Sequence, residues 1–319
     1  MENLYGGEKA YFCNDDKNIV TINTFGEINL INLKNNNCIK LFEHENKEYF
    51  NSFKNSWRSY NDIVLSNKGN FLFNQKPFII INLNNHTNFS NIIHVNKNTH
   101  IIDSNNEFII NNCNFIELSK NINIFYKISR NYQSIKHIDV NNEFNKIVFI
   151  GSTFDYDELV LMDLEKIEVI EKRSINSSTY DLEAEYCYNS RCFFNPFNEN
   201  EVFFLNPDSN DLKLYNFKTK EIIETFIREK IKFIEISNSK KYFITRNNEC
   251  DIIKIWDIKE KKLLYKIEVN HKKIVDEYVD LISFSSMSND DSKIVLSIDF
   301  GYGGGILVYD IKGNLIREY

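Results

Sequence analysis

Carboxylates and aromatic rings are interleaved in two stretches of the sequence, a combination suited to binding cations or to acid–base chemistry. The first group is Asp155, Tyr156, Asp157 and Glu158, and the second is Tyr180, Asp181, Glu183 and Glu185. Carboxylates pair with Lys and Arg, and aromatic faces attract cations, so both groups suit a basic peptide. Two carboxyl groups at a set separation could also hydrolyse a glycosidic bond. The remaining alternative is that these acidic loops only keep the protein in solution.

Motifs of known catalytic and cofactor sites are missing from the sequence. It contains no nucleophile elbow, no phosphate-binding loop and no HExxH zinc motif. The glycine-rich stretch 301–305 precedes an apolar strand-like run, whereas phosphate binding needs glycines that open a helix. The 6 cysteines include no CxxC pair, which disfavours zinc. We expect no enzyme activity, no cofactor and no metal, with a propeller-type hydrolase as the alternative.

Composition and charge narrow the class of protein. The chain has 319 residues, 42% of them hydrophobic, which is enough apolar surface for a large folded core. Its 38 Lys and Arg residues face 45 Asp and Glu residues, and the net charge of −7 disfavours a broad nucleic-acid or anionic-membrane surface. The polar first ten residues do not resemble a secretion signal. We expect a soluble cytoplasmic protein that binds neither nucleic acid nor membrane.

One short pattern recurs seven times along the chain. An apolar run is followed by Asn, Asp or Glu, then by one apolar residue, then by a polar turn. Successive copies are about 46 residues apart, close to the roughly 40–45 residues of a four-stranded propeller blade. The copies are Asn32-Leu33, Asn82-Leu83, Glu117-Leu118, Asp163-Leu164, Asn216-Phe217, Asp257-Ile258 and Asp310-Ile311.

The sixth copy, from Ile253 to Ile258, contains Trp256-Asp257 and resembles the ending that names the WD-repeat family. Degenerate versions end at Ile311, which includes Tyr309-Asp310, and at Phe217. This resemblance implies an all-β fold, a single seven-bladed β-propeller of four-stranded antiparallel blades. The blades are predicted at 8–42, 60–95, 99–128, 135–171, 190–227, 230–268 and 278–319.

Strand-like segments agree with this fold. Outer strands are predicted at Cys38–Phe42, Ile122–Ile128, Ile222–Phe226, Leu263–Ile267 and Leu315–Tyr319. The first and last blades each have their own outer strand, so no strand exchange between chain ends is expected. Alternating βα units are disfavoured because no amphipathic helix separates the strands.

The resemblance also implies structural roles for some residues. Trp256, Asp257, Tyr309 and Asp310 occupy the ends of blade strands. His271 matches the structural His of the family, which can join a relay with Ser297, Asp299 and Tyr309. The alternative is that His271 is an exposed loop residue.

In this family, one face of the propeller carries the loops most often used for partners. Both acidic stretches are predicted on that face. A possible helix there places Tyr49, Phe53 and Trp57 on one side, either as packing against the propeller or as an aromatic anchor for a partner. We therefore expect a noncatalytic scaffold that binds a protein or peptide, possibly a basic one. The alternative is a propeller enzyme or small-ligand sensor with its site at the central channel mouth.

Overall fold

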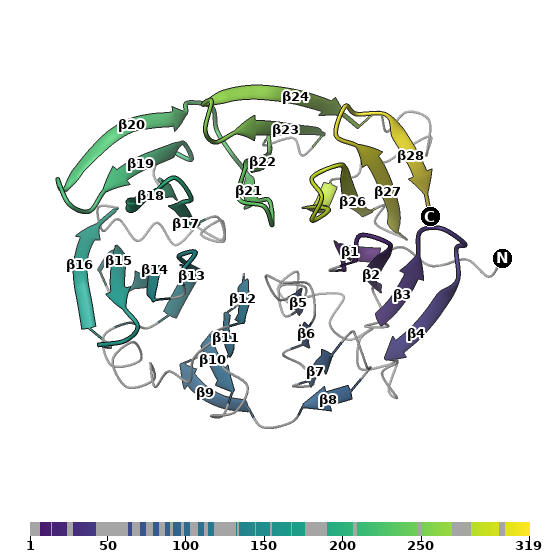
Figure 1. The fold of residues 1–319 in the computed structure, drawn as a ribbon, viewed down its shortest axis with the longest axis horizontal. Coiled ribbons are helices and arrows are strands. Elements are labelled where there is room, and N and C mark those ends of the chain that lie inside the picture. Colours follow the sequence, from purple (N-terminus) through teal and green to yellow (C-terminus); the bar gives the residue numbers. More distant parts are fainter. Residues whose placement is uncertain are drawn as a thin grey trace. The chain divides into compact units, whose positions relative to one another are not determined.

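In the computed structural model, the described residues form β-strands joined by turns (Figure 1). Two compact units are distinguished: unit 1 comprises residues 1–60, 83–86 and 232–319, and unit 2 comprises 61–82 and 87–231. Between residues 63 and 117 only the backbone is described. The structure describes residues 7–13, 15–23, 28–42, 63–65, 71–74, 79–82, 87–89, 92–96, 99–102, 108–111, 114–117, 132, 134–143, 145–153, 155–166, 168–175, 190–206, 209–247, 251–269, 282–299 and 304–319.

Unit 1 contains three four-stranded antiparallel sheets, each an up-and-down meander in chain order. The first sheet is β1 (Gly7–Phe12), β2 (Asn18–Asn23), β3 (Ile28–Asn32) and β4 (Cys38–Phe42). The sixth is β21 (Phe233–Ile236), β22 (Tyr242–Arg246), β23 (Ile252–Asp257) and β24 (Lys262–Glu268). The seventh is β25 (Ile282–Met287), β26 (Lys293–Asp299), β27 (Gly304–Asp310) and β28 (Leu315–Glu318). The fourth strand of each sheet lies where the sequence predicts an outer strand.

Unit 2 contains the other four sheets. The second sheet is β5 (Ile63–Leu65), β6 (Phe71–Asn74), β7 (Ile79–Asn82) and β8 (Thr87–Phe89). The third is β9 (Ile92–Asn96), β10 (Thr99–Ile102), β11 (Phe108–Asn111) and β12 (Asn114–Glu117). The fourth is β13 (Ser134–Val140), β14 (Lys146–Ser152), β15 (Asp157–Asp163) and β16 (Glu168–Ser174). The fifth is β17 (Cys192–Asn195), β18 (Asn198–Leu205), β19 (Leu212–Asn216) and β20 (Glu221–Ile227).

The third sheet differs from its prediction. The segment Ile92–Asn96, placed in the second blade by the sequence, pairs instead with β10, because a short connection leads β9 directly into an antiparallel neighbour. The last strand, β12, contacts β5 and β13, which are the first strands of their own sheets. The third sheet therefore runs in the opposite order to its neighbours. The predicted outer strand Ile122–Ile128 lies outside the described residues.

The recurring Asn or Asp forms the corner between the third and fourth strands of a sheet. The side-chain oxygen Oδ1 of Asn216 accepts hydrogen bonds from the backbone N–H groups of Lys218 and Thr219, at 2.8 and 3.0 Å. Asp163 accepts from Glu165 and Lys166 in the same way, at 2.9 Å each. Such side chains replace backbone partners in tight turns, which explains why the repeat requires a short polar residue here.

The apolar residue that follows the Asn or Asp ties this corner to the rest of its sheet. The N–H of Phe217 donates to the carbonyl of Asn200 at 2.8 Å, next to the turn between the first two strands. Leu33, Leu164, Ile258 and Ile311 make the equivalent bonds to Lys17, Asn145, Lys241 and Ser292. Both halves of the repeat motif are thus explained by one corner.

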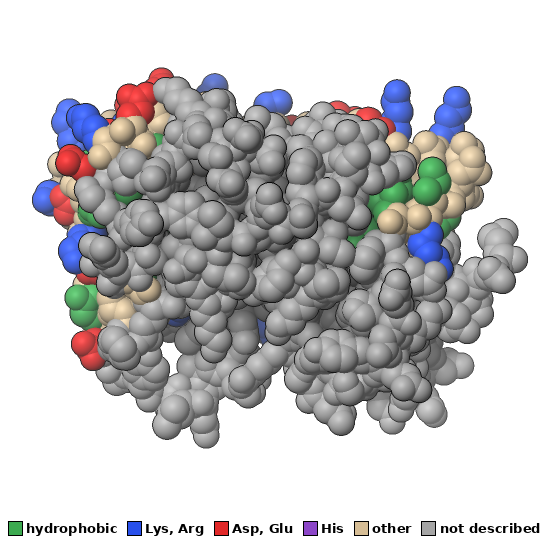
Figure 2. Space-filling model, turned by 90° about the horizontal axis from the view of Figure 1, so that it is seen from below, with side chains coloured by type: hydrophobic (Ala, Val, Ile, Leu, Met, Phe, Trp, Pro, Cys, Tyr) green, Lys and Arg blue, Asp and Glu red, His purple; other side chains and the backbone are tan. Residues whose placement is uncertain are grey.

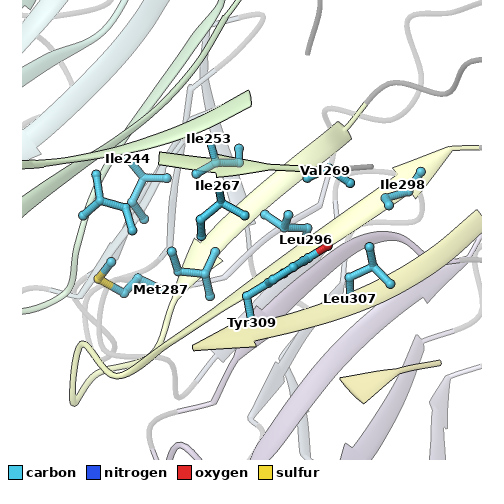
Figure 3. Packing of buried hydrophobic residues seen from close by; sticks show 11 residues of the cluster. Ile244, Ile253, Ile267, Val269, Met287, Leu296, Ile298, Leu307 and Tyr309 are labelled. Atoms are coloured by element: carbon cyan, nitrogen blue, oxygen red, sulfur yellow. The ribbon is translucent and has the colours of Figure 1, made fainter. Parts of the chain in front are cut away.

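Apolar residues of neighbouring sheets form continuous cores within each unit. In unit 1, Ile244, Ile253 and Ile267 of the sixth sheet pack with Leu296 and Tyr309 of the seventh (Figure 3). In unit 2, one cluster joins the fourth and fifth sheets through residues that include Ile150, Leu159, Phe194, Phe204 and Tyr215. Residues Ile147 to Ile150 are all buried, so β14 is covered on both faces.

The first and seventh sheets pack against each other without exchanging a strand. Phe12 and Ile31 share a core with Val295 and Val308. The Asp16 carboxylate accepts the backbone N–H groups of Asn289 and Asp290, at 2.6 and 2.9 Å, and Asn289 Nδ2 at 3.1 Å. Polar contacts therefore connect the turn after β1 to the turn after β25.

The contact between Asp16 and Asn289 is expected to couple the two sheets energetically. Asp16→Ala and Asn289→Ala should each lower the free energy of unfolding by about 1–2 kcal/mol, because each leaves partners unsatisfied. A double-mutant cycle measured by urea unfolding should give a coupling energy of about 1 kcal/mol. Among the described residues, Asp15 accepts bonds from Lys17 and Asn18 of its own turn alone, so Asp15→Ala combined with Asn289→Ala should be additive. Additivity in the Asp16 cycle would contradict the assignment.

Candidate functional site

The connection between β14 and β15 is a tight turn that projects Asp155 and Tyr156. Thr153 closes the turn, because its N–H and its hydroxyl both donate to the carbonyl of Tyr156, at 2.9 and 2.8 Å. Its Oγ1 also accepts the N–H groups of Asp155 and Tyr156, at 3.3 and 3.1 Å. The Asp155 side chain is exposed and Tyr156 is 36% exposed. One threonine thus holds a carboxylate and an aromatic ring in a defined position at the surface.

Asp157 forms the base of this turn. It begins β15 and is buried, so its assignment to the loop is wrong. Its Oδ2 lies 2.6 Å from Lys136 Nζ, and its Oδ1 accepts the Ser152 hydroxyl at 2.8 Å. Lys136 reaches it because a bulge in β13 shifts the register between Ile135 and His137. Asp157 therefore fixes the turn to the two preceding strands.

Glu158 was also predicted in the loop and is instead buried in β15. Its Oε2 accepts the Tyr132 hydroxyl at 2.8 Å, and its Oε1 lies 3.1 Å from Lys172 Nζ on β16. Burial is the main reason that the Tyr132 pKa is raised, and the bond to Glu158 raises it further. The Tyr132 ring covers Gly151 so closely that an added Cβ would lie 2.4 Å from Cδ1. Only glycine fits at that position.

The structure therefore divides the predicted acidic region into two parts. Asp155 and Tyr156 are presented at the surface, whereas Asp157 and Glu158 are neutralised within the fourth sheet by two lysines. The other predicted partner-binding residues, Tyr180, Asp181, Glu183, Glu185 and Trp57, lie outside the described residues, as do Tyr49 and Phe53.

Two buried polar side chains that the sequence analysis missed link the fourth sheet to the fifth. His137 Nδ1 accepts the backbone N–H of Cys192 at 3.3 Å, and Asp139 Oδ2 accepts that of Phe194 at 2.9 Å. The donors belong to β17, an edge strand of its sheet, and their N–H groups would otherwise be buried without partners. His137 and Asp139 are two residues apart, so both side chains lie on the same face of β13. Two polar residues at this spacing in a strand are a sequence signal that could have identified them.

His137 is held in its neutral form. Burial lowers its pKa well below the ordinary value, and the positive charge of Arg191 lowers it further. Because Nδ1 accepts a hydrogen bond, the ring proton of the neutral form resides on Nε2. Asp139 and Arg191 are also buried in this inter-sheet region.

Among the predicted structural residues, Trp256 has a defined partner. Its Nε1 donates to Thr245 Oγ1 on the neighbouring strand β22 at 2.9 Å. Asp257 Oδ1 accepts the N–H of Glu260, and Asp310 accepts the N–H and Nδ2 of Asn314, so both shape the corners that follow their strands. Tyr309 is buried in the core between the sixth and seventh sheets. His271 lies outside the described residues, and the side chain of Asp299 is not described, so the predicted relay stays a prediction.

The described residues include no group of three or more His, Cys, Asp and Glu side chains arranged to hold a metal. In the same part of the chain, no helix has the length and apolar character needed to span a membrane.

Comparison with solved structures identifies the fold. The chain is similar to a Kuenenia stuttgartiensis hydrazine synthase chain, with a TM-score of 0.55 and 10% identity over 97% of this chain and 96% of the other. A chain of a mitotic checkpoint complex gives a TM-score of 0.53 and 10% identity, covering 95% and 86%. The β-propeller domain of Myceliophteria thermophila Cps50 (Swd1) gives 0.56 and 9%, covering 96% and 97%. No family model and no curated protein matches the sequence.

These similarities extend over nearly the whole chain and show the fold alone. The similar structures include a synthase as well as a checkpoint complex, so they do not distinguish an enzyme from a scaffold. The described residues form seven four-stranded antiparallel sheets, which is the all-β architecture predicted from the repeats. The chain is a β-propeller that resembles those of the WD40 type.

Neutral, buried His137 is expected to make folding stability depend on pH. In the unfolded chain its imidazole gains a proton near pH 6.5, whereas in the folded chain protonation requires a lower pH. Stability should therefore fall as the pH drops below about 6.5, by at most about 1.4 kcal/mol per pH unit from this residue. His137→Asn keeps an acceptor for the Cys192 N–H and should reduce this slope in urea unfolding at about pH 7.5 and pH 5.5.

Phe193 provides the matched control, because its ring packs edge-on against His137 with the centroids 5.0 Å apart. Phe193→Leu disturbs the packing but leaves the imidazole in place, so it should lower stability without changing the slope. An unchanged slope in His137→Asn would contradict the assignment.

Proposed function

We propose that this β-propeller is a noncatalytic scaffold, and that its Thr153–Tyr156 turn binds a Lys- or Arg-bearing segment of a protein or peptide. The observation that carries this proposal is an exposed carboxylate next to an exposed aromatic residue on a turn whose backbone is held by Thr153. Within the described residues, the Asp155 carboxylate has no ion-pair or hydrogen-bond partner. It is therefore available to a cation from another molecule.

Rigidity supports a binding role for this turn. A loop that already holds its bound shape loses little conformational entropy when a partner arrives. Thr153 fixes the turn from within, and the contacts of Asp157 with Lys136 and Ser152 fix its base. A guanidinium or ammonium group could pair with Asp155 while contacting the face of Tyr156.

The state of the neighbouring carboxylates supports binding over acid–base catalysis. Glycoside hydrolysis uses two carboxyl groups that act together on one bond. Asp157 is paired with Lys136, and Glu158 is paired with Tyr132 and Lys172. Each carboxylate thus has its own partner within the sheet, which suits a structural role.

A peptide-binding experiment tests the proposal. A library of Lys- and Arg-containing peptides, each matched with a version carrying Gln at those positions, should include peptides that bind only in the basic form. Asp155→Asn should weaken their binding about tenfold, because a charged hydrogen bond contributes roughly 1.5–3 kcal/mol. Tyr156→Leu should weaken it by a smaller factor, since an exposed cation–π contact contributes about 0.5–1 kcal/mol.

Glu143→Gln is the control for loss of one negative charge. Glu143 is exposed and precedes β14, whereas the Thr153–Tyr156 turn follows it, so the two lie at opposite ends of that strand. Equal weakening by Asp155→Asn and Glu143→Gln, or tight binding of the Gln peptides, would refute the proposal.

A further inference from the structure

Lysines project from the corner between the third and fourth strands in three neighbouring blades of unit 1. They are Lys259 and Lys262 in the sixth blade, Lys312 in the seventh and Lys34 in the first, and all four are exposed. The blades are in direct contact along this end. Gly313 of the seventh blade faces Ile267 of the sixth, and Arg317 donates to the carbonyl of Leu33 in the first.

Exposed apolar side chains follow these lysines on the outer strands. Leu263 on β24 is 42% exposed, Leu315 and Ile316 on β28 are 51% and 49% exposed, and Ile39 on β4 is 51% exposed. Figure 2 shows Lys and Arg side chains beside hydrophobic ones at the right of the view. We call the eight residues Lys34, Ile39, Lys259, Lys262, Leu263, Lys312, Leu315 and Ile316 the basic strip.

Three acidic side chains at this end accept hydrogen bonds from turns, whereas Glu260 is exposed between Lys259 and Lys262. Asp257 accepts the N–H of Glu260 at 2.7 Å, and Asp16 accepts N–H groups from the turn after β25. The Asp310 carboxylate accepts both the N–H and Nδ2 of Asn314, and these bonds lower its pKa. The ammonium groups, in contrast, extend into solvent. These carboxylates keep their negative charge, but over residues 32–39, 257–263 and 310–316 five Lys face three Asp or Glu, an excess of two positive charges in a chain whose net charge is −7.

The equivalent positions of the fifth blade have exposed apolar side chains but no comparable excess of lysines. Ile222 pairs with Tyr215 in the same register in which Leu315 pairs with Tyr309, and Ile222 and Ile223 are 40% and 47% exposed. The outer strand there begins with Glu221, and Lys220 is paired with Glu171 at 2.7 Å. These residues share the apolar exposure of the strip without its excess of positive charge, and they provide matched controls.

We propose that the basic strip binds an acidic amphipathic segment of a partner protein, in which Asp or Glu alternates with apolar side chains. Exposed ion pairs alone contribute little, so the adjacent apolar surface is what makes such a segment a better fit than a purely anionic one. Nucleic-acid phosphates would leave Leu263, Leu315 and Ile316 without counterparts. The strip follows the end of the third strand of each blade, whereas the Thr153–Tyr156 turn precedes the start of a third strand. The two surfaces are therefore different, and this inference does not depend on the basic-peptide proposal.

Fluorescence anisotropy with a labelled peptide of alternating Glu and Leu tests this assignment. The wild-type chain should bind it, and the paired substitution Lys259→Glu with Lys262→Glu should weaken binding at least about tenfold. Leu315→Ser with Ile316→Ser should also weaken binding several-fold, because apolar contact is lost. Lys218→Glu in the fifth blade and Ile222→Ser with Ile223→Ser should leave binding unchanged.

Further measurements separate this inference from its competitors. Thermal unfolding checks that each variant is folded, and Lys259→Gln with Lys262→Gln replaces the charge reversal if that variant unfolds. The inference is overturned if the fifth-blade variants weaken binding equally, or if a peptide with Ser in place of Leu binds as tightly. It is also overturned if vesicles containing phosphatidylserine bind to the strip and displace the peptide.

Discussion

A four-stranded sheet whose middle strands are apolar on both faces cannot be stable by itself, and this constraint governs the whole chain. Ile147 to Ile150 are buried on both sides of β14. Ile294 to Ile298 are similarly buried in β26, where every residue except Ser297 is apolar. Each sheet must therefore be covered by its neighbours, and the chain must return at a regular interval to supply the next one. The repeat in the sequence is the consequence of that demand.

Polar side chains satisfy the backbone groups that the packed sheets leave without a partner. The Asn or Asp corner satisfies the backbone where each third strand ends, and it anchors the following apolar residue to another turn of the same sheet. Between sheets, His137 and Asp139 satisfy edge N–H groups that no backbone ladder reaches. Asp16 performs the same task for a neighbouring turn. In each case a side chain accepts a hydrogen bond from a backbone N–H group that has no partner in a strand ladder. The residues that join neighbouring sheets therefore also satisfy backbone groups of those sheets.

Sequence reasoning located most strands because their information is local. The corner motif and the apolar runs recur in each blade, and Trp256-Asp257 marked the clearest copy. The order of the third sheet could not be derived, because it depends on which neighbour Ile92–Asn96 pairs with. Asp157 and Glu158 were misplaced for a related reason: their acidic neighbourhood suggests a loop, whereas their partners Lys136, Tyr132 and Lys172 are distant in sequence. Of the candidate site, Asp155 and Tyr156 were found at the surface, but the role of Thr153 in fixing them required coordinates.

The outer strands of the fourth to seventh sheets share an irregularity. In β24, Tyr265 pairs with Ile255 but Leu263 pairs with Trp256, so Leu264 is an extra residue, and β16, β20 and β28 shift at the equivalent point. Such bulges increase local twist and interrupt the regular row of donors and acceptors along a free edge. These bulges therefore disfavour the addition of a strand from a second chain. The chain can thus leave apolar side chains on its periphery while resisting growth into fibrils.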